Sequence, residues 1–185
     1  MESTVVVLIV ILVLIVVAVA AVLLYRRRSL RHRFGPEYDR VVAEHDNRSA
    51  AEQELRERER RHAELQLRPI SDEARSRYGS EWAALQARFV DEPADAVRQG
   101  DELVSRLVAE RGYPAGSYDD QVAHLSVEHA GTLGHYRDAH DIFLRNERGE
   151  ATTEQLRQAL VHYRAIFADI LGEQPNASSR TDTSG

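Results

Sequence analysis

The 185-residue sequence contains no cysteine and no lysine, so all 24 of its basic residues are arginine. Without cysteine the chain cannot form disulfides, thiolate metal sites or a cysteine nucleophile. Without lysine it lacks the lysine of a phosphate-binding loop and the amine of a Schiff base. The net charge of −6 argues against a nucleic-acid partner, because nucleic-acid-binding proteins present a basic face.

Short catalytic signatures are also missing from the sequence. It has no Gly-x-Ser-x-Gly, no His-Glu-x-x-His and no Gly-x-Gly-x-x-Gly motif. We therefore predict that the protein is not an enzyme and binds no cofactor.

One long apolar run is present near the start of the chain. Residues 5–24 are Val, Ile, Leu or Ala without interruption. As a helix, 20 residues span about 30 Å, the thickness of the hydrocarbon core of a bilayer. We predict a single transmembrane helix over residues 5–25. A cleaved signal peptide ending near Ala18-Val19-Ala20 is the alternative, but no arginine precedes the run, which is longer than the usual apolar region of about 7–15 residues.

Arginines on one side of this run predict its orientation. The positive-inside rule places them in the cytoplasm, with residues 1–4 outside and the rest of the chain inside. Residues 26–36 then form a basic juxtamembrane segment that can contact anionic headgroups. Its proposed membrane-surface residues are Arg26, Arg27, Arg28, Arg31 and Arg33.

Residues 37–68 are rich in Arg, Glu and Ala and favour a charged helix. Pairs such as Glu54 with Arg58 have the stabilising i,i+4 spacing. Apolar positions recur only loosely, and a polar gap around Asn47 predicts a kink. We expect a solvated helical stalk, through which the protein could form a homo-oligomer.

Residues 70–172 predict a compact all-α domain of four longer helices and one short one. Ser71 and Thr152 are expected N-caps, and Gly112 is an expected C-cap. The domain carries 11 Arg against 18 Asp and Glu, a net charge of −7. Residues 173–185 are polar and predicted to be disordered. The expected helices cover residues 72–89, 93–111, 119–128, 132–146 and 153–171.

Histidines in the last third of the chain raise the question of a metal site. His124, His129, His135 and His140 follow one another at spacings of five, six and five residues. Ligands on one helical face would be three or four residues apart, so this spacing favours solvated or capping histidines.

The tripeptide His135-Tyr136-Arg137 recurs as His162-Tyr163-Arg164. Both copies lead into apolar residues, which predicts an antiparallel pair of helices whose tyrosines share the core. The alternative is a polar pocket between these helices, formed by His135, Tyr136, His162, Tyr163 and Arg164.

The layout resembles a group of small uncharacterised membrane proteins from GC-rich actinobacteria. The resemblance is carried by Arg33-Phe34-Gly35-Pro36-Glu37-Tyr38, Arg88-Phe89-Val90-Asp91, Arg111-Gly112-Tyr113-Pro114 and His162-Tyr163-Arg164. It implies a membrane-anchored protein, and it brings no activity or site residue.

Taken together, these features predict a membrane-anchored cytoplasmic module that acts as a scaffold or adaptor. Its expected partners are the lipid bilayer and another protein. Two alternatives stay open. One is a domain that binds a small ligand or a metal through the region from His124 to His140 and His162. The other is a domain exported after cleavage of the N-terminal segment.

Overall fold

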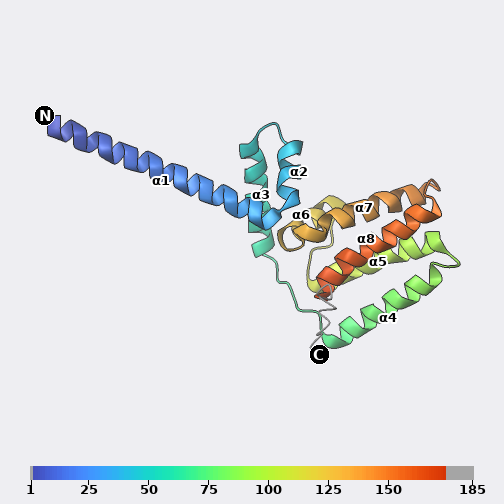
Figure 1. Cartoon of the computed structure of the whole chain (residues 1–185). Coiled ribbons are helices and arrows are strands. Elements are labelled where there is room, and N and C mark those ends of the chain that lie inside the picture. Colours follow the sequence, from blue (N-terminus) through green and yellow to red (C-terminus); the bar gives the residue numbers. More distant parts are fainter. Residues whose placement is uncertain (1, 174–185) are drawn as a thin grey trace, which may run out of the picture.

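The protein is all-α, as predicted. The structure, a computed structural model, describes residues 2–173, with side chains from Ile11 onward. This part of the chain forms eight helices and no strand. Helix α1 projects from a body that contains the other helices (Figure 1). Except for Glu173, the predicted disordered tail lies outside the described residues.

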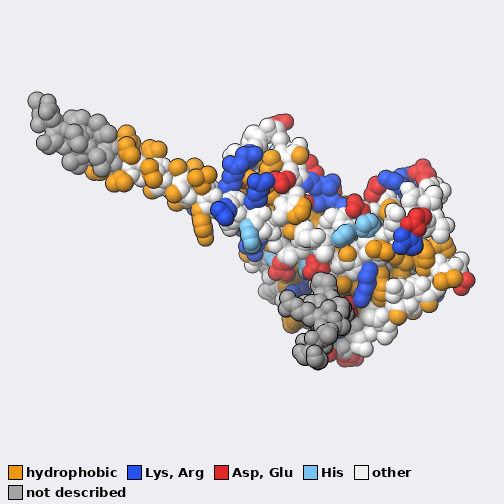
Figure 2. All heavy atoms as spheres, viewed as in Figure 1, with side chains coloured by type: hydrophobic (Ala, Val, Ile, Leu, Met, Phe, Trp, Pro, Cys, Tyr) orange, Lys and Arg blue, Asp and Glu red, His pale blue; other side chains and the backbone are white. Residues whose placement is uncertain are grey.

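Helix α1 extends from Glu2 to Phe34. It therefore includes most of the segment 26–36, which we had expected to separate the apolar run from the next helix. Every apolar side chain from Ile11 to Leu24 is exposed, and Figure 2 shows these side chains where α1 projects. Among the described residues, no helix is both long enough and apolar enough to cross a membrane.

Helices α2 (Pro36–Glu44) and α3 (Arg48–Ala63) form a hairpin beside the end of α1. The chain reverses at residues 45–47, where Asn47 caps α3 by accepting a hydrogen bond of 2.8 Å from the amide of Ala50. The polar gap around Asn47, where we predicted a kink, is therefore a turn between two helices.

The apolar side chains of this hairpin are buried, in contrast to the solvated stalk expected for residues 37–68. They form a cluster with the end of α1 and one residue of α6, termed the N-terminal cluster. Ala51 and Leu55, which a self-associating stalk would expose, are fully buried within the chain. The members of the cluster are Leu30, Phe34, Tyr38, Val41, Ala51, Leu55 and Val127.

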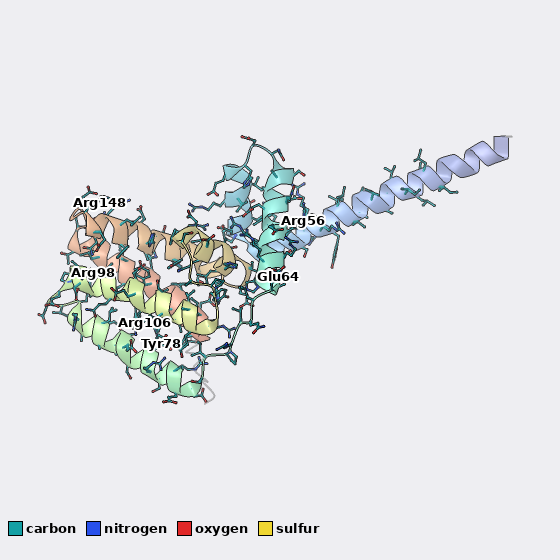
Figure 3. The ribbon with its side chains drawn as sticks, turned by 180° about the vertical axis from the view of Figure 1, so that it is seen from behind. Arg56, Glu64, Tyr78, Arg98, Arg106 and Arg148 are labelled. Carbon is teal, nitrogen blue, oxygen red and sulfur yellow. The ribbon has the colours of Figure 1, made fainter. Side chains whose placement is uncertain are left out.

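The remaining helices form a bundle. They are α4 (Asp72–Arg88), α5 (Pro93–Arg111), α6 (Tyr118–Glu128), α7 (Ala130–Glu147) and α8 (Thr153–Leu171). Helix α5 contacts α4, α7 and α8, while α7 and α8 pack along each other. Ion pairs also link α4 and α5, where Arg106 donates to Glu81 over 2.6 Å (Figure 3).

Helix boundaries and core positions of the bundle follow the sequence closely. Ser71 and Thr152 cap α4 and α8, and Gly112 ends α5 in the left-handed conformation at a φ of 104°. The buried residues of α8 form one apolar face of the helix from Leu156 to Leu171. Of the adjacent apolar residues 142–144, Ile142 faces the core and Leu144 is exposed, because neighbouring positions on a helix point about 100° apart.

Helix α6 joins the two parts of the molecule. Val122 and Leu125 belong to the core of the bundle, whereas Val127 belongs to the N-terminal cluster. The α3–α4 connection is fixed as well, since the amide of Arg68 donates to the carbonyl of Arg111 over 2.8 Å. The end of α1 is therefore packed onto the body through α2, α3 and α6.

Candidate functional site

The two histidines of the predicted polar pocket lie together on the surface of α7 and α8. These helices are antiparallel neighbours, as the repeated tripeptide predicts. The Nδ1 atoms of His135 and His162 are 2.9 Å apart, and their rings stack with centroids separated by 5.1 Å. Figure 2 shows histidine side chains gathered over α7 and α8.

The tyrosines beside them point the other way, into the core. Tyr136 donates to Gln121 over 3.0 Å, and Tyr163 donates to Asp101 over 2.6 Å. Burial raises the pKa of both phenols far above 10. They are therefore neutral hydrogen-bond donors that fix the core, and the predicted five-residue pocket is not formed as one site.

Arg164, the fifth residue of that predicted pocket, lies on another face of α8. Its guanidinium carbon is 5.7 Å from the ring centroid of Trp82 and 5.4 Å from that of Phe167. It also forms an ion pair of 2.7 Å with Glu173.

Asp138, which was not part of the predicted pocket, joins the two histidines. His135, Asp138 and His162 each present one ligand atom, and these three atoms lie within 4.8 Å of one another. Asp138 follows His135 by three residues, so both occupy one face of α7. That i,i+3 spacing was a detectable signal, but the partner from α8 is only evident once the helices are paired.

The other histidines of the 124–140 region lie at separate places. His129 is 2.9 Å from Asp169, and His140 stacks on Tyr118 with ring centroids 3.8 Å apart. Burial raises the pKa of Tyr118 to about 12. The region from His124 to His140 is therefore not a single cluster.

An apolar groove lies between α4 and α8. It is open, has a volume of about 270 Å³ and is lined mainly by apolar side chains. Trp82, the single tryptophan of the chain, is one lining residue, and Val161 is another, with 57% of its surface exposed. Both helices pack on α5, and no other described helix covers this face between them. The groove is lined by Trp82, Gln86, Phe89, Arg157, Leu160, Val161 and Arg164.

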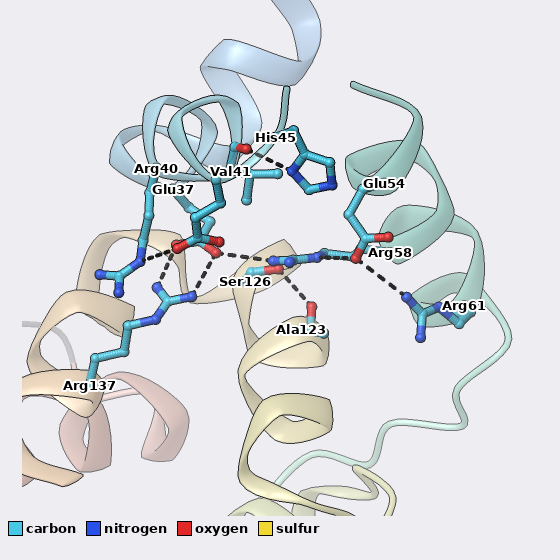
Figure 4. Close-up of polar contacts among 11 residues, drawn as sticks. Glu37, Arg40, Val41, His45, Glu54, Arg58, Arg61, Ala123, Ser126 and Arg137 are labelled. Atoms are coloured by element: carbon cyan, nitrogen blue, oxygen red, sulfur yellow. Dashed lines mark hydrogen bonds and ion pairs between the residues drawn. The ribbon is translucent and has the colours of Figure 1, made fainter. Parts of the chain in front are cut away.

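A buried ion network holds the N-terminal helices against the bundle (Figure 4). Glu37 of α2 is 3% exposed and accepts hydrogen bonds from Arg58 of α3, over 3.0 Å, and from Arg137 of α7, over 2.8 Å. Burial lowers the pKa of Arg137, but the hydrogen bonds and charge of Glu37 outweigh it, and the net change is upward. Glu37 was expected in a solvated stalk, so the sequence analysis missed this network.

The arginines after the apolar run differ in their contacts. Arg27, Arg31 and Arg33 lie 3.8, 3.1 and 3.4 Å from Glu52, Asp39 and Glu59, respectively. Arg26 and Arg28 are exposed and form no ion pair with the described residues. The expected membrane-surface set therefore divides into three arginines that bind the protein itself and two that face solvent.

Comparison of the chain with protein-family models, curated proteins and solved structures gives no match. The resemblance to actinobacterial membrane proteins therefore stays a prediction.

Proposed function

We propose that this protein is a membrane-anchored helical module that binds an amphipathic helix of a partner protein in the groove between α4 and α8. The single observation that carries the binding proposal is this apolar groove, open among the described residues, with its exposed Val161 and flanking arginines. Arg is enriched among the residues that dominate binding energy at protein interfaces.

Support for the anchor comes from the apolar run Val5–Leu24 and from the exposure of its described part. The side chains from Ile11 to Leu24 are apolar around the whole circumference of α1, which is typical of a helix that is covered by lipid or by protein. The arginines that follow support a cytoplasmic body through the positive-inside rule. Of these, Arg26 and Arg28 are available to anionic headgroups.

With such an anchor, the body would lie close to the lipid. Leu30 of the N-terminal cluster follows Leu24 by six residues, or about 9 Å along a helix. In this proposal the groove is presented near the membrane surface, without the long spacer that a stalk would provide.

Topology can be tested with single cysteines, because the natural chain has none. Ser3→Cys and Ser76→Cys are each treated with a membrane-impermeant maleimide in intact cells. We expect labelling at residue 3 directly, and at residue 76 only after the membrane is permeabilised. Labelling of residue 76 in intact cells would contradict the cytoplasmic placement, and loss of the N-terminus in intact-mass measurement would support signal cleavage.

The chemistry of the groove suggests the occupant. Its volume admits only a few apolar side chains, and it is open, so it suits one face of a helix better than an enclosed small molecule. Arg157 and Arg164 flank the apolar lining. Carboxylates beside the apolar stripe of the occupant would bind these guanidinium groups.

Site-specific photocrosslinking tests the groove in the full-length, membrane-bound protein. A photoreactive amino acid replaces Val161 in the groove or, as a matched control, the exposed Leu144 of α7. We expect a crosslinked partner at residue 161 only, and mass spectrometry should place the contact in an amphipathic helix with acidic flanks. Equal amounts of crosslinked partner at both positions would contradict the proposal. A crosslink from residue 161 to a second copy of this chain would show that the groove mediates a homodimer and would also contradict it.

A further inference from the structure

We infer that His135, Asp138 and His162 form a binding site for a divalent transition-metal ion. The site lies on the outer face of α7 and α8, and it is independent of the groove between α4 and α8. Imidazole and carboxylate are the side chains that most often bind Zn²⁺, Ni²⁺, Cu²⁺ and Fe²⁺ together.

The fold brings these ligands together from two helices. His135 and Asp138 share one face of α7 through their i,i+3 spacing. Tyr136 and Tyr163 are packed in the core with ring centroids 6.4 Å apart, which fixes the register of α7 against α8. Because each histidine directly precedes one of these tyrosines, the same register places the two imidazoles opposite each other.

The two Nδ1 atoms are close enough to bind the same ion. The Nδ1 atoms are 2.9 Å apart. With metal–nitrogen bonds of about 2.0–2.1 Å, two ligands at a right angle lie about 2.9 Å apart, and two tetrahedral ligands lie about 3.3 Å apart. Both values are close to the observed separation, so the two imidazoles can bind one ion after a small shift of their side chains. Among the imidazole-binding ions, Cu²⁺ and Ni²⁺ bind tightly in the general order of affinities.

Two histidines and one carboxylate leave coordination positions open. His135 and Asp138 are exposed and His162 is half-buried, so water or a further ligand can complete the shell. The domain around the site has a net charge of −7, which favours a cation over an anion there. A bound ion would also link α7 to α8 and stabilise the folded state.

Calorimetric titration with Ni²⁺ tests the site in full-length protein purified in detergent without a polyhistidine tag. We expect one ion per chain. The dissociation constant should be more than about tenfold higher in His135→Ala and in His162→Ala than in the wild type. Asp138→Asn, which keeps the shape and removes the charge, should weaken binding as well. His32→Ala is the matched control, because His32 is an exposed helical histidine remote from the site.

Two further measurements keep the result interpretable. Circular dichroism checks that each variant is folded. Adding Ni²⁺ should raise the Tm of the wild type and of His32→Ala, and it should leave the Tm of the site variants unchanged. Cu²⁺ should give an electron paramagnetic resonance spectrum with nitrogen coupling that His162→Ala changes. Equal Ni²⁺ binding by the wild type and by a variant lacking both His135 and His162 would overturn the site.

Discussion

Glu37 illustrates how one side chain can join segments that are far apart in the sequence. It lies on α2, and its carboxylate binds Arg58 on α3 and Arg137 on α7, 100 residues away. The side chains of Arg58 and Arg137 are only 12% and 16% exposed. A buried ion pair is weak evidence for net stability, but removing one partner leaves the other charges uncompensated.

We predict that Glu37→Gln lowers the free energy of unfolding by about 3 kcal/mol, because the largely buried Arg137 loses its counter-charge and Arg58 keeps only Glu54. Chemical denaturation measures the change. Glu44→Gln is the matched control on the same helix, since Glu44 forms an exposed i,i+4 pair with Arg40 and such pairs contribute little. Similar losses in both variants would show that burial does not set the importance of Glu37.

At the level of the helices, Gly112 both ends α5 and leaves room for the α3–α4 connection. Its φ of 104° is in the left-handed region, and an added Cβ would lie 2.7 Å from the carbonyl oxygen of Gln66. Gly149 also has a positive φ, of 72°, but an added Cβ there meets nothing within 4 Å. The two glycines therefore share a backbone constraint and differ in the steric one.

We predict that Gly149→Ala lowers the free energy of unfolding by about 1 kcal/mol, from backbone strain alone. Gly112→Ala should cost about 2–3 kcal/mol, because the backbone around Gln66 must also move. Thermal or chemical unfolding of both variants measures the difference. If Gly112→Ala lowers the free energy of unfolding no more than Gly149→Ala does, the α3–α4 connection adapts to the added Cβ without strain.

The predictability of these helices depends on how local their causes are. Helices α4, α5 and α8 were predicted because caps, prolines and apolar stripes lie within each segment, as with Thr152, Gln155 and the face from Leu156 to Leu171. Helices α2 and α3 were expected to be solvated because their few apolar residues are buried only by α1 and α6. The pairing of His135 with His162 was indicated by a repeated tripeptide. The ion pair between Glu37 and Arg137 had no such signal, because nothing near either residue in the sequence points to the other.

On the scale of the whole molecule, two hydrophobic clusters meet at a joint that contains His62. This histidine lies on α3 and is 8% exposed. Its ring centroid is 6.0 Å from that of Tyr113, and its Nε2 atom is 3.8 Å from Glu128 of α6. Burial lowers the pKa of His62 below 6.5, and the positive charges of Arg33 and nearby histidines add to this, while Glu128 opposes it.

The lowered pKa makes the free energy of unfolding depend on pH. Unfolded His62 takes up a proton as the pH falls through about 6.5, while the folded side chain stays neutral until its lower pKa is reached. The unfolded state therefore binds more protons in this window. The contribution of His62 to the free energy of unfolding should therefore be complete above about pH 6.5 and should decline as the pH falls below this value. His124, whose pKa burial also lowers, acts in the same direction.

We predict that His62→Gln flattens this decline, because a glutamine at the joint cannot take up the proton. Denaturant unfolding of both proteins is measured between pH 8 and pH 5. Their curves should run parallel above pH 7, where His62 is neutral in either state, and then converge as the wild type loses stability toward pH 5. Hydrogen exchange should show the loss first in α3 and α6, which meet at His62. Curves that stay parallel down to pH 5 would mean that His62 is protonated without disturbing the contact between the two clusters.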